Sequence, residues 1–107
     1  MKDQFLEHLL SIIKSKKDEN PKVSYTAMLQ QEDIIETLKK IEEEAFEVIE
    51  AAKLKNKNDI IHEIADLWFH CLVLLAKKDI TVAEITAELQ KRQGVSGIEE
   101  KLNRVKK

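Results

Sequence analysis

Residues that break helices or cross-link a fold are scarce in this sequence. Its 107 residues include one proline, two glycines and one cysteine. The single cysteine, Cys71, cannot form an internal disulfide, which is typical of proteins from a reducing compartment. Runs of alternating polar and apolar residues, the pattern of half-buried strands, are absent as well. The sequence therefore predicts an all-α protein without a β-sheet.

Long hydrophobic runs and a large excess of charge are also absent. No apolar run approaches the roughly 20 residues that span a bilayer. Asp3 and Glu7 interrupt the N-terminal apolar residues, which argues against a signal peptide. Charged residues make up 36%, but the net charge is −2, so no basic field indicates nucleic acid as a partner. We expect a soluble, cytoplasmic protein with neither a membrane nor a nucleic-acid partner.

The apolar content suffices for one small core. A length of 107 residues fits a single domain, residues 1–107, and 43% of the residues are hydrophobic. Because surface dominates in a chain this small, pairing with a second copy would bury more apolar area. We therefore expect a helical bundle that is completed by formation of a homodimer.

Apolar residues recur at helical spacing along most of the chain. The expected segments are a helix from about residue 5 to 13, a short turn at 27–30, a long helix capped by Asp33, a helix capped by Asn58 or Asp59 that runs to 77 or 78, and a last helix that begins at Thr81 or Asp79. A loop at 94–97 and a charged tail at 98–107 follow.

The two central helices differ in their apolar patterns. The fourth helical segment, capped by Asn58 or Asp59, is apolar on almost every face, so we expect it to be buried. The long helix carries one apolar stripe, which consists of Ile34, Leu38, Ile41, Ala45, Val48 or Ile49, and Ala52.

Two acidic clusters lie on these central helices, Glu43-Glu44-x-x-Glu47 and Glu63-x-x-Asp66. Residues three and four apart share a helix face, so each cluster forms one patch, and the short polar loop between the helices allows the patches to face each other. A carboxylate in an apolar helix needs a cationic partner, yet no Lys or Arg lies within a turn of Glu63 or Asp66. We therefore expect a divalent metal ion between the helices.

The donor types indicate which ion to expect. A cluster of carboxylate oxygens suits Mg²⁺, with Mn²⁺ as a possible substitute. Zinc is not expected, because His62 and His70 lie eight residues apart and Cys71 has no second cysteine. His70 fits a hydrogen-bonded core histidine better than a ligand, although a phosphate-facing role stays open.

Simpler explanations exist for the same residues. Glu-rich helices are often solvated, and Lys39 and Lys40 precede Glu43 and Glu44 by one turn, a spacing that allows weak ion pairs. The chain has no Gly-rich phosphate loop, so phosphate contacts would come from the metal and from lysines such as these. A non-catalytic helical dimerisation module is the alternative from another functional class.

The two acidic motifs match the EExxE and ExxD signature of the all-α nucleoside triphosphate pyrophosphatase (MazG-like) superfamily. Three flanking motifs make the chain resemble one member family, the phosphoribosyl-ATP pyrophosphatases. They are Ser24-Tyr25-Thr26-Ala27, Leu38-Lys39-Lys40 and Ser96-Gly97-Ile98-Glu99-Glu100-Lys101. The resemblance covers nearly the whole chain. A housecleaning pyrophosphatase of the same superfamily is the runner-up.

The resemblance implies a nucleotide-binding hydrolase of histidine biosynthesis. Its members hydrolyse the α–β phosphoanhydride of phosphoribosyl-ATP with Mg²⁺, which gives phosphoribosyl-AMP and pyrophosphate. By position, Glu44, Glu47, Glu63 and Asp66 would be metal ligands, and Glu43 would be a further ligand or orient the attacking water. Glu43 and Glu44 are thus the catalytic candidates.

Substrate contacts follow from the resemblance in the same way. The candidates are Ser24, Tyr25, Thr26, Lys39, Lys40, His70 and Lys101. The chain departs from the family pattern at Glu42, where Gly is usual, at Met28, where Lys is frequent, and at Gln93, where His is common. We also expect the cyclohydrolase domain that often precedes this one to be absent here.

Overall fold

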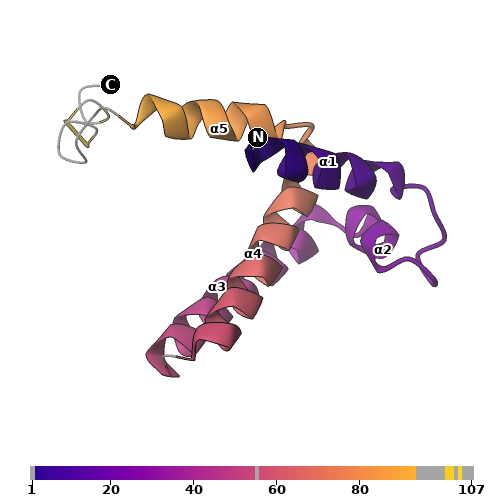
Figure 1. Cartoon of the computed structure of the whole chain (residues 1–107). Coiled ribbons are helices and arrows are strands. Elements are labelled where there is room, and N and C mark those ends of the chain that lie inside the picture. Colours follow the sequence, from indigo (N-terminus) through magenta and orange to yellow (C-terminus); the bar gives the residue numbers. More distant parts are fainter. Residues whose placement is uncertain (1, 55, 94–100, 103, 105–107) are drawn as a thin grey trace.

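Figure 1 shows the computed structural model, which describes residues 2–54, 56–93, 101, 102 and 104. The helices up to residue 93 are α1 (Lys2–Ser15), α2 (Tyr25–Gln31), α3 (Ile34–Leu54), α4 (Lys57–Lys78) and α5 (Val82–Lys91). No strand occurs in these described ranges, so the prediction of an all-α protein is confirmed. The predicted loop at 94–97 lies outside the described residues.

Side-chain caps explain where the helices begin. Ser24 Oγ accepts a hydrogen bond from the Ala27 amide at 3.1 Å at the start of α2. Thr81 and Glu84 form a capping box at the start of α5, so the prediction of Thr81 as the start is confirmed. At the start of α3, Asp33 Oδ1 accepts from the Ile35 amide at 2.8 Å, which agrees with the predicted cap.

The predicted cap of α4 was wrong. Asn56, rather than Asn58 or Asp59, caps this helix, since its Oδ1 accepts from the Asp59 amide at 3.2 Å. Asp59 therefore stands at the third helical position, where a backbone amide still needs a partner. At the other end of α4, Asp79 takes the left-handed conformation with φ 55°, which Asp tolerates better than most residues.

The helices form a hairpin and a cap (Figure 1). Helices α3 and α4 run antiparallel as a hairpin, α1 and α5 lie across one end of it, and α2 packs beside α4. The buried core lies at that end and consists of Leu10, Ile13, Leu29, Leu72, Val73 and Val82. The other end of the hairpin projects away from this core.

The contact between α3 and α4 differs from the predicted stripe. On α3, Thr37 and Ala51 are buried, whereas Leu38 and Ile49 of the predicted stripe are 46% and 53% exposed. Partly or fully buried residues recur at alternating spacings of three and four, at Ile34, Thr37, Ile41, Glu44, Val48 and Ala51. This is the spacing of a seam between two nearly antiparallel helices.

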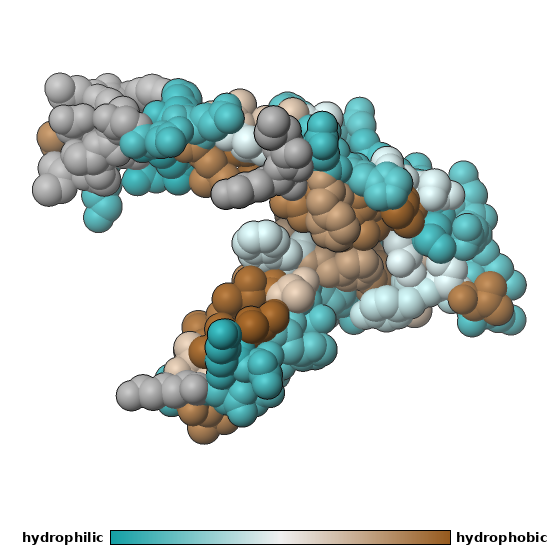
Figure 2. Space-filling model, in the orientation of Figure 1, coloured by the Kyte–Doolittle hydropathy of each residue, from teal (hydrophilic) through white to brown (hydrophobic). Residues whose placement is uncertain are grey.

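The prediction that α4 is buried on almost every face was also wrong. Only its C-terminal half enters the core, and Ile61 and Trp68 are 57% and 56% exposed. Together with Leu38, Phe46 and Ile49 on α3 they make up what we call the apolar hairpin face, all of whose members are exposed. Figure 2 shows apolar surface along the hairpin, on the side toward the open angle below α5.

No described helix combines the length and the apolar character that crossing a membrane requires.

The radius of gyration is 16.2 Å, whereas a compact domain of 100 residues has about 13 Å. The extended shape and the apolar hairpin face thus have the same cause, a hairpin that packs against little else in the single chain.

Candidate metal centre

The two acidic motifs lie on opposite helices of the hairpin, one on α3 and one on α4. Glu44 stands in the seam and is half-buried, as are Glu63 and Asp66 on α4. Burial raises the pKa of Glu44, and the negative charges of Asp66, Glu63, Glu47 and Glu43 raise it further, in that order. The structure therefore brings the other four predicted acids within electrostatic reach of Glu44.

The tightest part of the cluster is on α4. One ligand atom each from His62, Glu63 and Asp66 lies within 4.8 Å of the others. His62 Nε2 and Asp66 Oδ2 are 3.3 Å apart, because positions four apart meet on a helix face. His62 was not among the predicted site residues. The spacing of four residues between His62 and Asp66 could have identified His62. Only its spacing of eight residues from His70 was considered in the sequence-based prediction.

This donor set fits a divalent cation. Among the described residues, Asp66 is the only one of the five acids with a basic side chain within 4.0 Å, and that side chain is the imidazole of His62. Carboxylate oxygens in this number are the ligands that Mg²⁺ and Mn²⁺ take. Glu43 and Glu47 are exposed and remain accessible to a ligand from solvent.

The predicted lysines differ in their surroundings. Lys39 Nζ pairs with Glu36 at 3.3 Å on the exposed side of α3. Lys40 is half-buried and helps to lower the pKa of His70, so it faces α4. Lys101 is exposed, and no described contact joins it to the acids. Of the three, Lys40 is the one that the fold brings toward the cluster.

The predicted residues around α2 serve the fold first. The hydroxyl of Ser24 is the cap of α2, and the carbonyl of Thr26 accepts from Gln30 Nε2 at 3.3 Å. Tyr25 is 56% exposed. No described hydrogen bond or ion pair connects these three residues with the acidic motifs.

His70 lies beside the acids on α4 and is only 6% exposed. Burial lowers its pKa, and so does Lys40, while Asp66, Glu32 and Glu43 act in the opposite direction. Its Nδ1 is buried and has no hydrogen-bond partner in the described part of the chain, so the expectation of a hydrogen-bonded core histidine was wrong for this atom. Its ring packs edge-on against Phe69, with centroids 5.6 Å apart.

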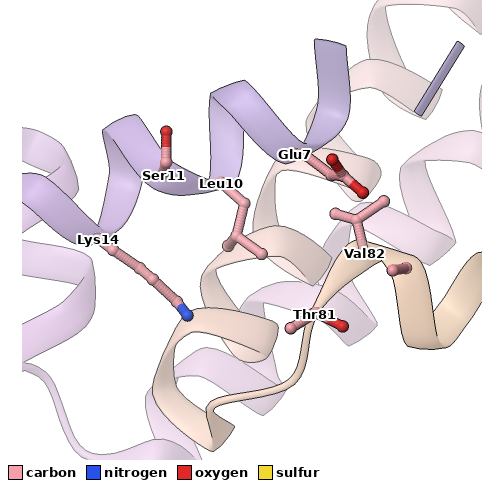
Figure 3. A pocket seen from close by; sticks show the side chains of 7 residues that line it. Glu7, Leu10, Ser11, Lys14, Thr81 and Val82 are labelled. Atoms are coloured by element: carbon pink, nitrogen blue, oxygen red, sulfur yellow. The ribbon is translucent and has the colours of Figure 1, made fainter. Parts of the chain in front are cut away.

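A separate hollow of about 310 Å³ lies between α1 and the start of α5 (Figure 3). It is lined by Glu7, Leu10, Ser11, Lys14, Thr81, Val82 and Ala83. Lys14, on its wall, pairs with Asp79 at 3.4 Å. None of the predicted site residues lines it, so the candidate site is the acidic cluster on the hairpin.

An all-helical chain with EExxE facing ExxD across a hairpin has the arrangement expected of the all-α nucleotide pyrophosphatases. The family model for phosphoribosyl-ATP pyrophosphohydrolase matches residues 6–93. The chain belongs to this family, which confirms the resemblance seen in the sequence.

Curated relatives agree over nearly the whole chain. A phosphoribosyl-ATP pyrophosphatase of Nitrosomonas eutropha is 50% identical over 99 residues, which cover 92% of this chain and 85% of that protein. Proteins of the same name are 47% identical in Geobacter metallireducens, covering 98% and 96%, and 44% identical in Hydrogenovibrio crunogenus, covering 99% and 97%. The family assignment therefore does not depend on the acidic motifs alone.

Proposed function

We propose that the chain hydrolyses phosphoribosyl-ATP to phosphoribosyl-AMP and pyrophosphate, the second step of histidine biosynthesis, in the cytoplasm and as a single domain of residues 1–107. The observation that supports this best is the convergence of four carboxylates from α3 and α4 on a fifth, Glu44, whose pKa they raise together. The names of the relatives point to the same substrate.

In this proposal Glu44, Glu47, Glu63 and Asp66 hold Mg²⁺, or Mn²⁺ in its place. When bound, such an ion neutralises phosphate charge and lowers the pKa of water. Glu43 and Glu44 orient the attacking water toward the α–β phosphoanhydride. Because these acids stand on two packed helices, they are held at fixed separations before the substrate arrives.

Substrate binding is assigned to residues around the acids. Lys40 and His70 are the best placed, since Lys40 is half-buried beside the seam and close enough to His70 to help lower the pKa of its imidazole. Lys40 would contact a phosphate, and His70 would donate or accept a hydrogen bond at the nucleotide. The remaining assignments, which rest on the family pattern alone, are Ser24, Tyr25, Thr26, Lys39 and Lys101.

The protein is further proposed to act as a homodimer. The apolar hairpin face exposes Phe46 at 58%, Trp68 at 56% and Ile61 at 57% in the single chain. Apolar groups of this size would normally be covered, and a second hairpin of the same kind would complete a four-helix bundle.

The experiment is an assay of pyrophosphate release from phosphoribosyl-ATP with Mg²⁺. Glu47→Gln should lower the rate by at least about 10- to 100-fold, because changing even an outer partner of a metal ligand costs that much and Glu47 is proposed to hold the ion itself. Glu50→Gln, one turn further along α3 and paired with Lys53 at 3.3 Å, is the matched control and should keep the rate.

Parallel assays separate the competing functions. Faster hydrolysis of dCTP, dUTP or ATP would favour a housecleaning pyrophosphatase. No release from any nucleotide, together with a melting temperature that Mg²⁺ and Mn²⁺ leave unchanged, would favour a non-catalytic module and overturn the proposal. If the protein binds the ion, a free ion concentration of about 100 times the dissociation constant should instead raise the free energy of unfolding by about 2.7 kcal/mol. A chelator should reverse this effect.

A further inference from the structure

We propose that His62 is a nitrogen ligand at the outer edge of the metal centre, and that it makes this edge prefer borderline divalent ions such as Co²⁺ over Mg²⁺. The inference rests on the proposed metal centre and adds to it a residue outside the carboxylate motifs. It concerns which ion binds, not whether the nucleotide is hydrolysed.

The positions of the donor atoms carry the argument. Ligand atoms of His62, Glu63 and Asp66 lie within 4.8 Å of one another, at helix positions i, i+1 and i+4. Two donors at about 2.1 Å from a shared ion are separated by about 3 to 4 Å in tetrahedral or octahedral geometry. The His62 Nε2 to Asp66 Oδ2 distance of 3.3 Å already lies in this range.

The surroundings of His62 favour a ligand over a simple ion pair. An exposed ion pair between two helix residues four positions apart contributes little to the stability of a protein on its own. Here the pair stands at the rim of a cluster of five acids, where Glu44 from α3 is close enough for Asp66 and Glu63 to raise its pKa. The His62 side chain is 71% exposed, so it has room to turn its Nε2 toward an ion held by Asp66.

The chemistry of the donors then decides the selectivity. Mg²⁺ takes oxygen ligands and retains its water molecules, whereas imidazole suits the later first-row ions. Oxygen donors of the four predicted ligands serve both kinds of ion. A nitrogen donor at the rim therefore strengthens the binding of Co²⁺, Zn²⁺ or Ni²⁺ while leaving that of Mg²⁺ nearly unchanged.

The test compares the wild type with His62→Gln and, as the matched control, with His8→Gln, an exposed histidine of α1. Calorimetric titration with Co²⁺ and with Mg²⁺, without nucleotide, should give a Co²⁺ dissociation constant at least about tenfold higher in His62→Gln, and a Mg²⁺ constant within about twofold. His8→Gln should match the wild type for both ions.

A spectroscopic readout identifies the ligand directly. Electron spin echo modulation of bound Mn²⁺ should show coupling to a nitrogen nucleus in the wild type and in His8→Gln, and none in His62→Gln. Equal Co²⁺ affinity in wild type and His62→Gln, absence of nitrogen coupling in the wild type, or failure of the wild type to bind Co²⁺ would each overturn the proposal.

These measurements are independent of catalysis. Co²⁺ binding that depends on His62, in a protein that does not hydrolyse phosphoribosyl-ATP, would overturn the proposed function and support the role of His62. Hydrolysis with Mg²⁺, combined with unchanged Co²⁺ binding in His62→Gln, would do the reverse.

Discussion

Asp66 on α4 faces Glu44 on α3 across the hairpin, and it is the strongest of the four charges that raise the pKa of Glu44 beyond the effect of burial. The two residues belong to different motifs, 22 positions apart by their numbers (66 − 44), and meet because α3 and α4 run antiparallel. This cross-hairpin pair joins the two acidic motifs in a single electrostatic cluster.

The first prediction concerns Glu44 in the metal-free protein. Because its pKa is raised above the ordinary 4.5, the folded state binds a proton more tightly than the unfolded state, and stability falls as pH rises through the interval above 4.5. Glu44→Gln should remove this decline and, near neutral pH, raise the free energy of unfolding, because it removes both the burial of a charge and the repulsion from the neighbouring acids; the repulsion alone is worth about 0.2–0.5 kcal/mol.

Urea unfolding at several pH values, with a chelator present, measures the effect. Glu42→Gln on the exposed side of α3 is the control and should keep the wild-type slope. A Glu44→Gln protein that is less stable than the wild type near neutral pH would contradict the prediction.

His70 should give the opposite pH dependence. Burial and Lys40 lower its pKa below 6.5, so the unfolded state binds the proton more readily, and stability falls as pH drops below 6.5. In His70→Phe this contribution should vanish, which flattens the plot of unfolding free energy against pH between about pH 7.5 and pH 5.5.

The same variant should also lose activity. Pyrophosphate release by His70→Phe should fall at least about tenfold, a typical loss for a positioned polar group. His8→Phe serves as the control, and an unchanged slope in His70→Phe would refute the prediction.

Lys77 ties three helices together at the core end of the hairpin. Its Nζ donates to the carbonyl of Glu32 at 2.8 Å and to the hydroxyl of Thr37. Lys77→Met should lower the free energy of unfolding by about 1–3 kcal/mol, because it leaves the buried hydroxyl of Thr37 and the carbonyl of Glu32 without this donor. Chemical denaturation checks this, with Lys78→Met, its exposed neighbour, expected within about 0.5 kcal/mol of the wild type.

The apolar hairpin face should hold the dimer together. Trp68→Asp would place a charge in the proposed interface and should raise the dimer dissociation constant by at least about 30-fold, the effect of losing 2 kcal/mol at a hot spot. Sedimentation equilibrium measures the constant. Val23→Asp alters a side chain that is 83% exposed outside the hairpin and should leave it unchanged. A wild type that sediments as a stable monomer at micromolar concentration would contradict the dimer itself.

Local signals in the sequence predicted the helices well. Thr81 with Glu84 three residues later is a complete capping box, and the long apolar periods of α3 and α4 left no room for strands. The family also followed from the sequence, because the spacing of the acids and the flanking motifs is preserved.

The faces of the helices were harder to predict, because α3 has two apolar stripes. One contains Ile41, Val48 and Ala51 and packs on α4, while the other contains Leu38, Phe46 and Ile49 and lies exposed. Periodicity alone cannot say which stripe faces which neighbour. His62 was missed for a related reason. It approaches Asp66 because residues four apart meet on a helix face, and it belongs to neither acidic motif.

The seam also determines which changes of length the chain can accept. Each residue of an α-helix turns the chain by about 100°. One residue added inside α3 between Glu47 and Leu54 would rotate Glu44 out of register with α4, whereas the same addition between the end of α3 at Leu54 and the start of α4 at Lys57 would leave both helices in register. Natural variation in length should accordingly concentrate at the hairpin tip, and an engineered tag or reporter inserted there should be tolerated.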